Sequence, residues 1–433
     1  MDKNSVKIFL IAMILMLIIP GTSAVNFSKT ENVPTENSLH TLDLSVNILD
    51  LITQVNESLV RYYLKGLVDI GPRYTGSDNC KKAANYIFDE FKKIGLDVQI
   101  QQWRYLNYNC QNVVATLNGS DSDSDSVVVI SAHYDTVKNT PGANDDGTGV
   151  SAILSIANIF SKYLFKHTIK FIAFSGEEIG AIGAHEYVKN AYENNENIIA
   201  ALDIDMIGYT NSSNNKNFLQ VLFHDRSSWI FNLINEIIEK YGFSNFGAKI
   251  SPNFPSCNYH PFFDYGYDSA LFTHDDSILY PWLHTPEDTI DKINYSYFVN
   301  ATKILVAMFG YIADIDITIQ VRIVSPLENY FYISNIPIKL PGFNTYKTGL
   351  RGMTYVLGRP YVKINISSEE EIDCVWFCID GMAENFSKGY TDSWRLKRGL
   401  YPLRGRHTIG VYVFTTSGKT AYDEMDVFIL SMR

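Results

Sequence analysis

The chain has 433 residues, of which 46% are hydrophobic and 19% are charged. This length indicates more than one domain, and the composition excludes a disordered, collagen-like or coiled-coil protein. Lysine and arginine together number 36 against 47 aspartates and glutamates, so the net charge is −11. That balance gives no electrostatic reason to expect a nucleic-acid partner. Five cysteines are too few for a disulfide-built scaffold.

The N-terminus has the features of a cleaved export signal. Lys3 and Lys7 precede an unbroken apolar run from Ile8 to Ile19, and small residues follow it up to Ala24. As a helix this run would rise only about 18 Å, short of the roughly 30 Å of a bilayer core. We therefore expect residues 1–24 to be a signal peptide and residues 25–45 a polar linker. The mature protein is expected to be secreted or cell-surface associated, with no membrane span after signal removal.

Helical and strand-like segments alternate over most of the chain. Helical periodicity is expected from Val46, with positions 59, 63, 64, 67 and 68 on one face, and further helices are expected at 78–94, 147–163, 179–190, 229–241 and 297–312. Strands are expected at 97–103, 112–117, 127–132, 168–174, 198–203 and 269–272. The run from Val127 to Ala132 is nearly continuously apolar, as in strands buried on both faces of a parallel sheet. This alternation predicts an α/β domain over residues 46–315, with a mostly parallel sheet sandwiched by helices.

The pattern changes near residue 316. Short strand-like segments follow one another without a helix-length period, at 317–324, 332–340, 361–366, 373–379, 407–414 and 426–430. Their number and spacing predict an all-β, immunoglobulin-like sandwich over residues 316–433. We expect this domain to contact a cell surface, a glycan or the preceding domain.

Acidic residues and histidines follow the predicted strands at five places. These are His133-Tyr134-Asp135, Asn144-Asp145-Asp146, Gly176-Glu177-Glu178, Asp203-Ile204-Asp205 and His284-Thr285-Pro286-Glu287-Asp288. Each segment alone is typical of a surface ion pair or a solvated helix start. Together they would gather like charges at the edge where open parallel sheets bind ligands, and a divalent metal would neutralise them. Imidazole and carboxylate ligands without thiolates suit zinc, with cobalt or manganese as alternatives.

In this order the five segments resemble the M28 family of peptidases, which hold two zinc ions in one site. The segment Gly71-Pro72-Arg73-Tyr74-Thr75-Gly76-Ser77 resembles the approach to that domain. The resemblance covers about residues 50–312 and implies a secreted aminopeptidase with peptide or protein substrates. The later strands resemble immunoglobulin-like modules appended to secreted archaeal and bacterial enzymes.

Position by position, the resemblance implies five metal ligands and a general base. The shared ligand of the two zinc ions would be Asp145, with His133 and Asp205 completing one site and Glu178 and His284 completing the other. Glu177 would be the base, taking a proton from water and passing it to the leaving amine. Asp135 would orient His133 and so determine its tautomer.

One segment departs from the family pattern. The family often shows Ser-Asp-His followed by an aromatic residue before the last strand, whereas this chain has Asn258-Tyr259-His260-Pro261-Phe262. His260 is expected at the matching place, and Tyr259 replaces the usual acid. We expect Tyr259, His260 and Phe262 to bind substrate in an apolar pocket.

Three other functions remain open at this point. A carboxypeptidase of the same fold would need a cationic clamp, and the region offers only Arg61, Arg73, Arg104 and Arg226. A glutaminyl-peptide cyclase has a similar fold but uses a single zinc. A binding module on an inactivated scaffold should have lost ligands or the base, and none is missing.

Two of the cysteines are expected to pair. Cys80 falls in the first turn of a predicted helix and Cys110 just before a predicted strand, both beside the same sheet. Export would place them in an oxidising compartment, which favours a disulfide. Cys374 and Cys378 point the same way along one strand but lie about 13 Å apart, which is too far for a bond.

Overall fold

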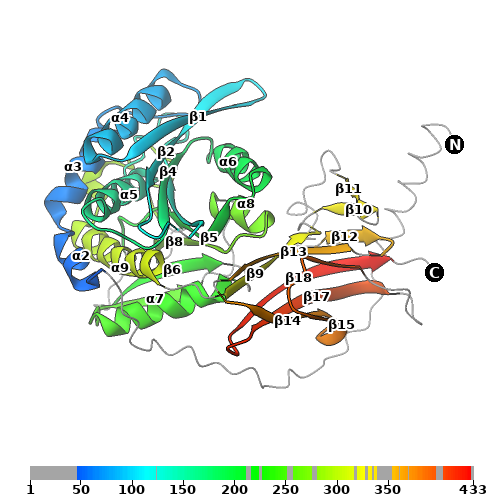
Figure 1. Cartoon of the computed structure of the whole chain (residues 1–433). Coiled ribbons are helices and arrows are strands. Elements are labelled where there is room, and N and C mark those ends of the chain that lie inside the picture. Colours follow the sequence, from blue (N-terminus) through cyan, green and yellow to red (C-terminus); the bar gives the residue numbers. More distant parts are fainter. Residues whose placement is uncertain are drawn as a thin grey trace, which may run out of the picture. The chain divides into compact units, whose positions relative to one another are not determined.

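The computed structural model describes residues 46–430, apart from 123, 211–215, 224–226, 251–256, 276–279, 316–318, 327–329, 334–335, 339–353, 360, 369 and 396–402. The predicted signal peptide and linker lie outside the described residues. Figure 1 traces the chain through a part built of helices and strands and then a part built of strands.

An eight-stranded sheet forms the centre of the first part. Its order is β1-β2-β4-β3-β5-β8-β6-β7. The strands are β1 (Asp97–Tyr105), β2 (Tyr108–Leu117), β3 (Ser126–His133), β4 (Thr168–Phe174), β5 (Asn197–Ile204), β6 (Asn217–Phe223), β7 (Phe246–Ile250) and β8 (Ser269–His274). Strands β4, β3, β5 and β8 are parallel neighbours. The pairs β1–β2, β2–β4 and β6–β8 are antiparallel, so the sheet is mixed and the predicted mostly parallel pairing holds at its centre.

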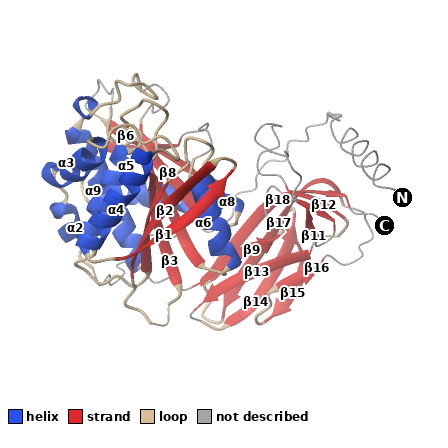
Figure 2. Cartoon of the chain, turned by 90° about the horizontal axis from the view of Figure 1, so that it is seen from above, coloured by secondary structure: helices blue, strands red, loops and turns tan. Residues whose placement is uncertain are grey.

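Helices cover both faces of this sheet (Figure 2). They are α2 (Ile48–Gln54), α3 (Glu57–Val68), α4 (Asp78–Ile94), α5 (Gly147–Phe160), α6 (Ile182–Glu193), α7 (Ser228–Lys240), α8 (Tyr259–Asp264) and α9 (Tyr295–Asp314). Helices α6 and α8 pack together on one face, whereas α2, α3, α4, α5, α7 and α9 form a connected layer on the other.

Local sequence explains why α4 begins and ends where it does. The Ser77 side chain accepts a hydrogen bond from the Cys80 amide at the N-terminus, and Gly95 ends the helix at φ 97°. Positions Ala83, Ile87 and Phe91 are fully buried at the spacing of one helical face. Strand β3 differs because all eight of its residues are buried, as its apolar run predicts.

The expected elements of this part are present, with two kinds of difference. The helix expected from residue 179 begins only at Ile182, because residues 177–181 form a tight turn in which the amides of Gly180 and Ala181 both donate to the carbonyl of Glu177. The helical segment expected from Val46 is divided into α2 and α3, and strands β6 and β7 and the short helix α8 were not predicted. Short apolar runs such as β6 do not distinguish strand from helix by periodicity.

The helix α9 is long and apolar enough, by length and composition, to cross a membrane. However, 78% of that stretch is buried among the other described residues. Its residues Ile304, Leu305 and Phe309 are fully buried, which is the pattern of a core helix.

The described residues after α9 are all strand and turn. One sheet has the order β11-β10-β12-β18-β17-β14-β15 and a second has the order β16-β13-β9. The strands are β9 (Ile319–Ser325), β10 (Phe331–Ile333), β11 (Ile336–Ile338), β12 (Thr354–Leu357), β13 (Tyr361–Ser368), β14 (Ile372–Ile379), β15 (Met382–Lys388), β16 (Ser393–Arg395), β17 (Arg404–Thr415) and β18 (Thr420–Leu430). Residues from both sheets share one core, including Val362, Trp394, Phe377 and Val411. The immunoglobulin-like class and the domain boundaries at 46–315 and 316–433 remain predictions.

Candidate metal centre

The predicted site residues come together at one edge of the eight-stranded sheet. His133 ends β3, Asp205 follows β5, and Glu177 and Glu178 lie in the turn between β4 and α6. These strands are parallel neighbours, so their carboxyl ends lie at the same edge. Asp145 precedes α5, and His284 lies in the connection between β8 and α9. The structure therefore gathers all five predicted ligands and the predicted base.

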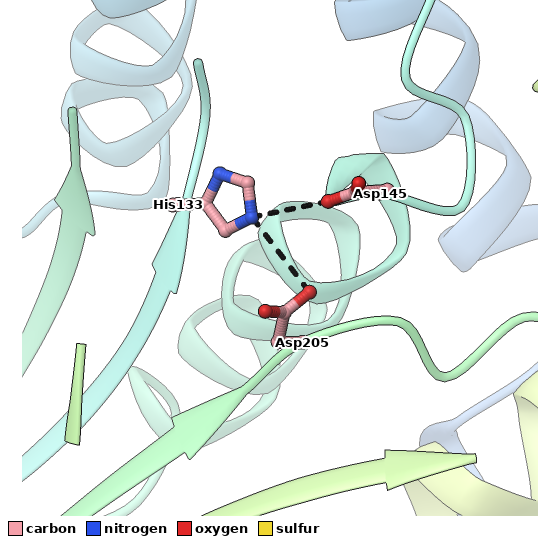
Figure 3. Close-up of side chains that lie close together, drawn as sticks. All are labelled: His133, Asp145 and Asp205. Atoms are coloured by element: carbon pink, nitrogen blue, oxygen red, sulfur yellow. Dashed lines mark ion pairs between the residues drawn. The ribbon is translucent and has the colours of Figure 1, made fainter. Parts of the chain in front are cut away.

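Asp145 lies at the centre of this group because its two oxygens face two different histidines. Its Oδ1 is 3.2 Å from Nε2 of His133, and its Oδ2 is 3.2 Å from Nε2 of His284. Oδ1 of Asp205 is 3.7 Å from the same nitrogen of His133, and Oε2 of Glu178 is 3.3 Å from Nε2 of His284. Figure 3 shows the carboxylates of Asp145 and Asp205 both directed at the His133 ring. One carboxylate is thus common to two groups of three ligands.

The nitrogen and oxygen atoms of this group are arranged as metal ligands rather than as hydrogen-bond partners of one another. Nε2 of His133 and Oδ1 of Asp205 are buried and make no hydrogen bond. Each group of three, His133-Asp145-Asp205 and Asp145-Glu178-His284, offers ligand atoms within 4.8 Å of one another. Imidazole and carboxylate donors without thiolate are the donor set of catalytic zinc sites. The residues present therefore fit divalent metal ions.

The electrostatics of the group also favour a bound cation. Burial raises the pKa of Glu178 to about 8, and the charge of Asp145 adds to the effect. Burial likewise raises the pKa of Glu177 and of Asp205 above their usual values. For Asp145, burial raises the pKa, but the facing imidazoles of His133 and His284 outweigh it and hold the pKa below its usual range. Buried carboxylates whose ionised form is disfavoured need positive charge beside them, which a divalent ion supplies.

Asp135 has a different geometry from the one expected. Nδ1 of His133 donates to the backbone carbonyl of Asp135 at 3.1 Å, whereas the nearest carboxylate oxygen is 3.6 Å away. The carboxylate instead accepts hydrogen bonds from the hydroxyl of Thr75 at 2.6 Å and from the amides of Glu177 and Glu178 at 3.2 and 3.4 Å. The carbonyl thus orients the imidazole, and the carboxylate holds the turn that carries the predicted base.

Arg73 and Asp288 hold the loop that carries Asp145. The Arg73 guanidinium is fully buried and donates to the carbonyls of Tyr134, Pro141 and Gly142 at 2.7, 2.6 and 2.9 Å. The Asp288 carboxylate accepts from the amides of residues 144 and 145 at 2.9 and 3.1 Å. Both residues lie in motifs quoted above, but their bonding partners could not be read from the sequence.

His274 and Asn144 form a second support that sequence reasoning missed. Nδ1 of His274 donates to the carbonyl of Asp275 at 3.0 Å, so its Nε2 accepts from the Asn144 amide group at 3.1 Å. The Asn144 side-chain oxygen in turn accepts from the amide of Gly208 at 2.8 Å. Because Asn144 precedes Asp145, this network connects β8 and the loop after β5 to the shared ligand. A histidine at the end of the last parallel strand was the only sequence signal for it.

The predicted substrate-binding residues lie in the interior. Phe262 has no exposed surface and packs in the core against Phe174 and Tyr187. Tyr259 and His260 are 5% and 1% exposed. α8 turns these three side chains toward the sheet, and their contact with substrate remains a prediction. The same segment instead brings Cys257, itself 2% exposed, within 4.8 Å of Glu177 and Asp205.

Comparisons with known proteins agree with this geometry. Residues 112–309 match the family described as Peptidase family M28. Aminopeptidase YwaD of Bacillus subtilis is 29% identical over 207 residues, which are 47% of this chain and 45% of YwaD. A probable leucine aminopeptidase of Arthroderma otae is 26% identical over 310 residues, which are 66% of this chain and 80% of the relative.

The fold has similar solved structures. One is BSAP, a zinc aminopeptidase from Bacillus subtilis, which aligns with a TM-score of 0.54 and 20% identity. The alignment covers 60% of this chain and 95% of that structure. The remainder of this chain, about two fifths of it, lies outside that likeness.

Proposed function

We propose that this chain is a secreted aminopeptidase that uses two zinc ions, because residues 112–309 match Peptidase family M28 and the similar proteins include aminopeptidases. The observation that carries the proposal is the position of Asp145. Its two carboxylate oxygens each lie 3.2 Å from Nε2 of a different histidine. A carboxylate shared in this way supports two adjacent metal positions rather than one.

His133, Asp145 and Asp205 would hold one ion, and Asp145, Glu178 and His284 the other. When bound, a pair of such ions lowers the pKa of water and polarises the carbonyl of the scissile bond. His133 would bind through Nε2, since its Nδ1 donates a hydrogen bond to the Asp135 carbonyl.

Glu177 is the residue placed to move the proton. It lies in the turn after β4 beside the ligand Glu178, and its amide is held by Oδ1 of Asp135 at 3.2 Å. Its carboxylate lies next to Asp205 without belonging to either group of three ligands. Burial raises its pKa, which favours a group that accepts a proton from water and returns it to the leaving amine.

Recognition of a free α-amine agrees with the charges available. The described edge of the sheet is rich in carboxylates, which suit an ammonium group. Arg73 is fully buried and engaged by three carbonyls, so it does not clamp a substrate carboxylate. Arg61 is paired with Glu57 on the surface of α3. The carboxypeptidase alternative is therefore disfavoured, and the named relatives are aminopeptidases rather than cyclases.

The test compares a leucyl anilide with its N-acetylated form, each with and without chelator and added zinc. We expect the free amine to react at least about tenfold faster, because a blocked amine leaves buried polar groups unpaired. Glu177→Gln should retain the metal, measured by elemental analysis, and lose most turnover. Equal rates for the two anilides would indicate an endopeptidase or carboxypeptidase, and cyclisation of N-terminal glutamine without cleavage would indicate the cyclase.

Secretion is part of the same proposal and has its own test. Residues 1–24 should be absent from the protein exported by its host, and N-terminal sequencing of the culture medium would reveal the new terminus. A retained N-terminus on a cell-bound protein would contradict secretion but would leave the peptidase proposal intact.

A further inference from the structure

Two cysteines from different elements lie side by side in the interior. Cys80 in the first turn of α4 and Cys110 in β2 have their sulfur atoms 3.4 Å apart. Their exposed fractions are 0% and 7%. The structure records both as thiols, in contact but not bonded to each other. A buried pair at this separation needs only a small movement to reach the bonding distance of two sulfurs, about 2.05 Å.

We propose that Cys80 and Cys110 form a disulfide that clamps the residues supporting the metal centre. In the balanced reaction, the Cys110 thiolate attacks a low-molecular-weight disulfide such as oxidised glutathione and releases one thiolate. The Cys80 thiolate then displaces the second. The two cysteines lose two electrons and two protons, and one molecule of the oxidant becomes two thiols.

The environment of the pair supports Cys110 as the attacking sulfur. A hydrogen bond from Cys80 lowers the pKa of Cys110 to about 6, and Ser175 acts in the same direction, although burial opposes both. The contact with Cys110, together with burial, raises the pKa of Cys80. Cys110 is also the more exposed of the two. It is therefore the sulfur with more thiolate and better access to an oxidant.

On the β2 side, the bond would restrain a carbonyl that holds two segments of the site. The carbonyl of Gln111, the next residue after Cys110, accepts from the hydroxyl of Tyr134 at 2.5 Å and from the hydroxyl of Ser175 at 2.8 Å. Tyr134 lies between His133 and Asp135, and Ser175 lies two residues before Glu177. A displacement of β2 at this point would therefore reach both segments.

On the α4 side, the bond would restrain the turn that leads into the helix. Ser77 caps α4 by accepting from the Cys80 amide at 3.1 Å. Two residues earlier, the hydroxyl of Thr75 donates to Oδ2 of Asp135 at 2.6 Å. Asp135 holds the turn of Glu177 through its other oxygen. Both ends of the proposed bond are thus linked, through short chains of hydrogen bonds, to the turn that carries Glu177.

The first experiment determines the redox state. The full-length chain is exported into an oxidising medium, free thiols are alkylated under denaturing conditions, and peptides are mapped without reduction. We expect Cys80 and Cys110 in one linked peptide. Alkylation of both cysteines under these denaturing conditions would overturn the proposal. Peptide mapping does not depend on peptidase activity, so it tests the disulfide independently of the proposed function.

The second experiment measures the clamp by thermal unfolding with and without a phosphine reductant. Cross-linking residues 80 and 110 should raise Tm by about 5–10 °C over the reduced protein. The double variant Cys80→Ser/Cys110→Ser should not respond to reductant, whereas the matched control Cys374→Ser/Cys378→Ser should keep the full response. A reductant effect that persists in the first variant would refute the assignment. If that variant fails to fold, mapping and reductant titration of the wild type decide the matter.

The effect on turnover rests on the proposed function. Reduction should lower kcat for a leucyl anilide by about threefold to tenfold at unchanged zinc content, because the turn of Glu177 loses a restraint. An unchanged kcat in a protein whose disulfide is shown by mapping would refute the clamp while leaving the bond itself established.

Discussion

Arg73→Lys is the substitution that best tests how the metal centre is supported. Arg73 is fully buried, and its three nitrogens donate to three carbonyls in two segments, one carrying His133 and the other leading to Asp145. Lysine retains the positive charge but has a single nitrogen on a flexible stem, so it cannot reproduce the planar fork. We expect it to satisfy one of the three carbonyls and leave two buried without a donor.

The magnitude follows from those contacts. A hydrogen bond to a charged group contributes about 1.5–3 kcal/mol, so two lost bonds should reduce the free energy of unfolding by about 3–6 kcal/mol. Because the two segments carry the predicted ligands His133 and Asp145, zinc affinity should fall as well. Unfolding is measured in urea on the metal-free protein, so that loss of metal does not enter the stability difference.

Arg61→Lys provides the matched control. Arg61 lies on α3 and pairs with Glu57, with side chains 46% and 55% exposed. An exposed pair contributes about 0–1 kcal/mol, so this variant should resemble the wild type in stability and zinc content. If the free energy of unfolding of Arg73→Lys also lies within about 1 kcal/mol of the wild-type value, the Arg73 guanidinium does not hold the two segments together and the reasoning is wrong.

Three further predictions concern zinc content, stability at low pH and packing of the core. Asp145→Asn should reduce bound zinc from two ions toward one or none per chain by elemental analysis, because one charge serves both sites; two tightly held ions would contradict a shared ligand. Burial lowers the pKa of His274 to about 4, so the unfolded chain takes up its proton first, and stability should fall by up to about 3 kcal/mol as the pH drops from about 6.5 to 4. His274→Gln should flatten that part of a pH series of urea unfolding. Phe262→Ala should lower the free energy of unfolding by about 3–5 kcal/mol with little change in KM of the folded fraction, whereas a large rise in KM would support its predicted substrate role.

The sequence by itself determined the elements with strong patterns and the chemistry of the site. The apolar run of β3 predicted a strand buried on both faces, and the periodicity of α4 predicted a helix whose ends agree with the structure. The grouping of the five predicted ligands could be inferred because each follows a strand or opens a helix, and parallel neighbours bring such positions to one edge. For these residues, position along the chain was enough to infer position in space.

Tertiary structure alone decided the residues that support the site and the residues that are buried. Arg73 bonds to carbonyls 61 to 69 residues away, and Asn144 meets His274 across 130 residues, so no local pattern encodes either contact. Phe262 and Tyr259 are aromatic residues near the ligands, a composition that suits a pocket and a core equally well. Packing of α8 against the sheet placed them inside, because a buried aromatic side chain gains more from contact with other apolar groups than from exposure to water.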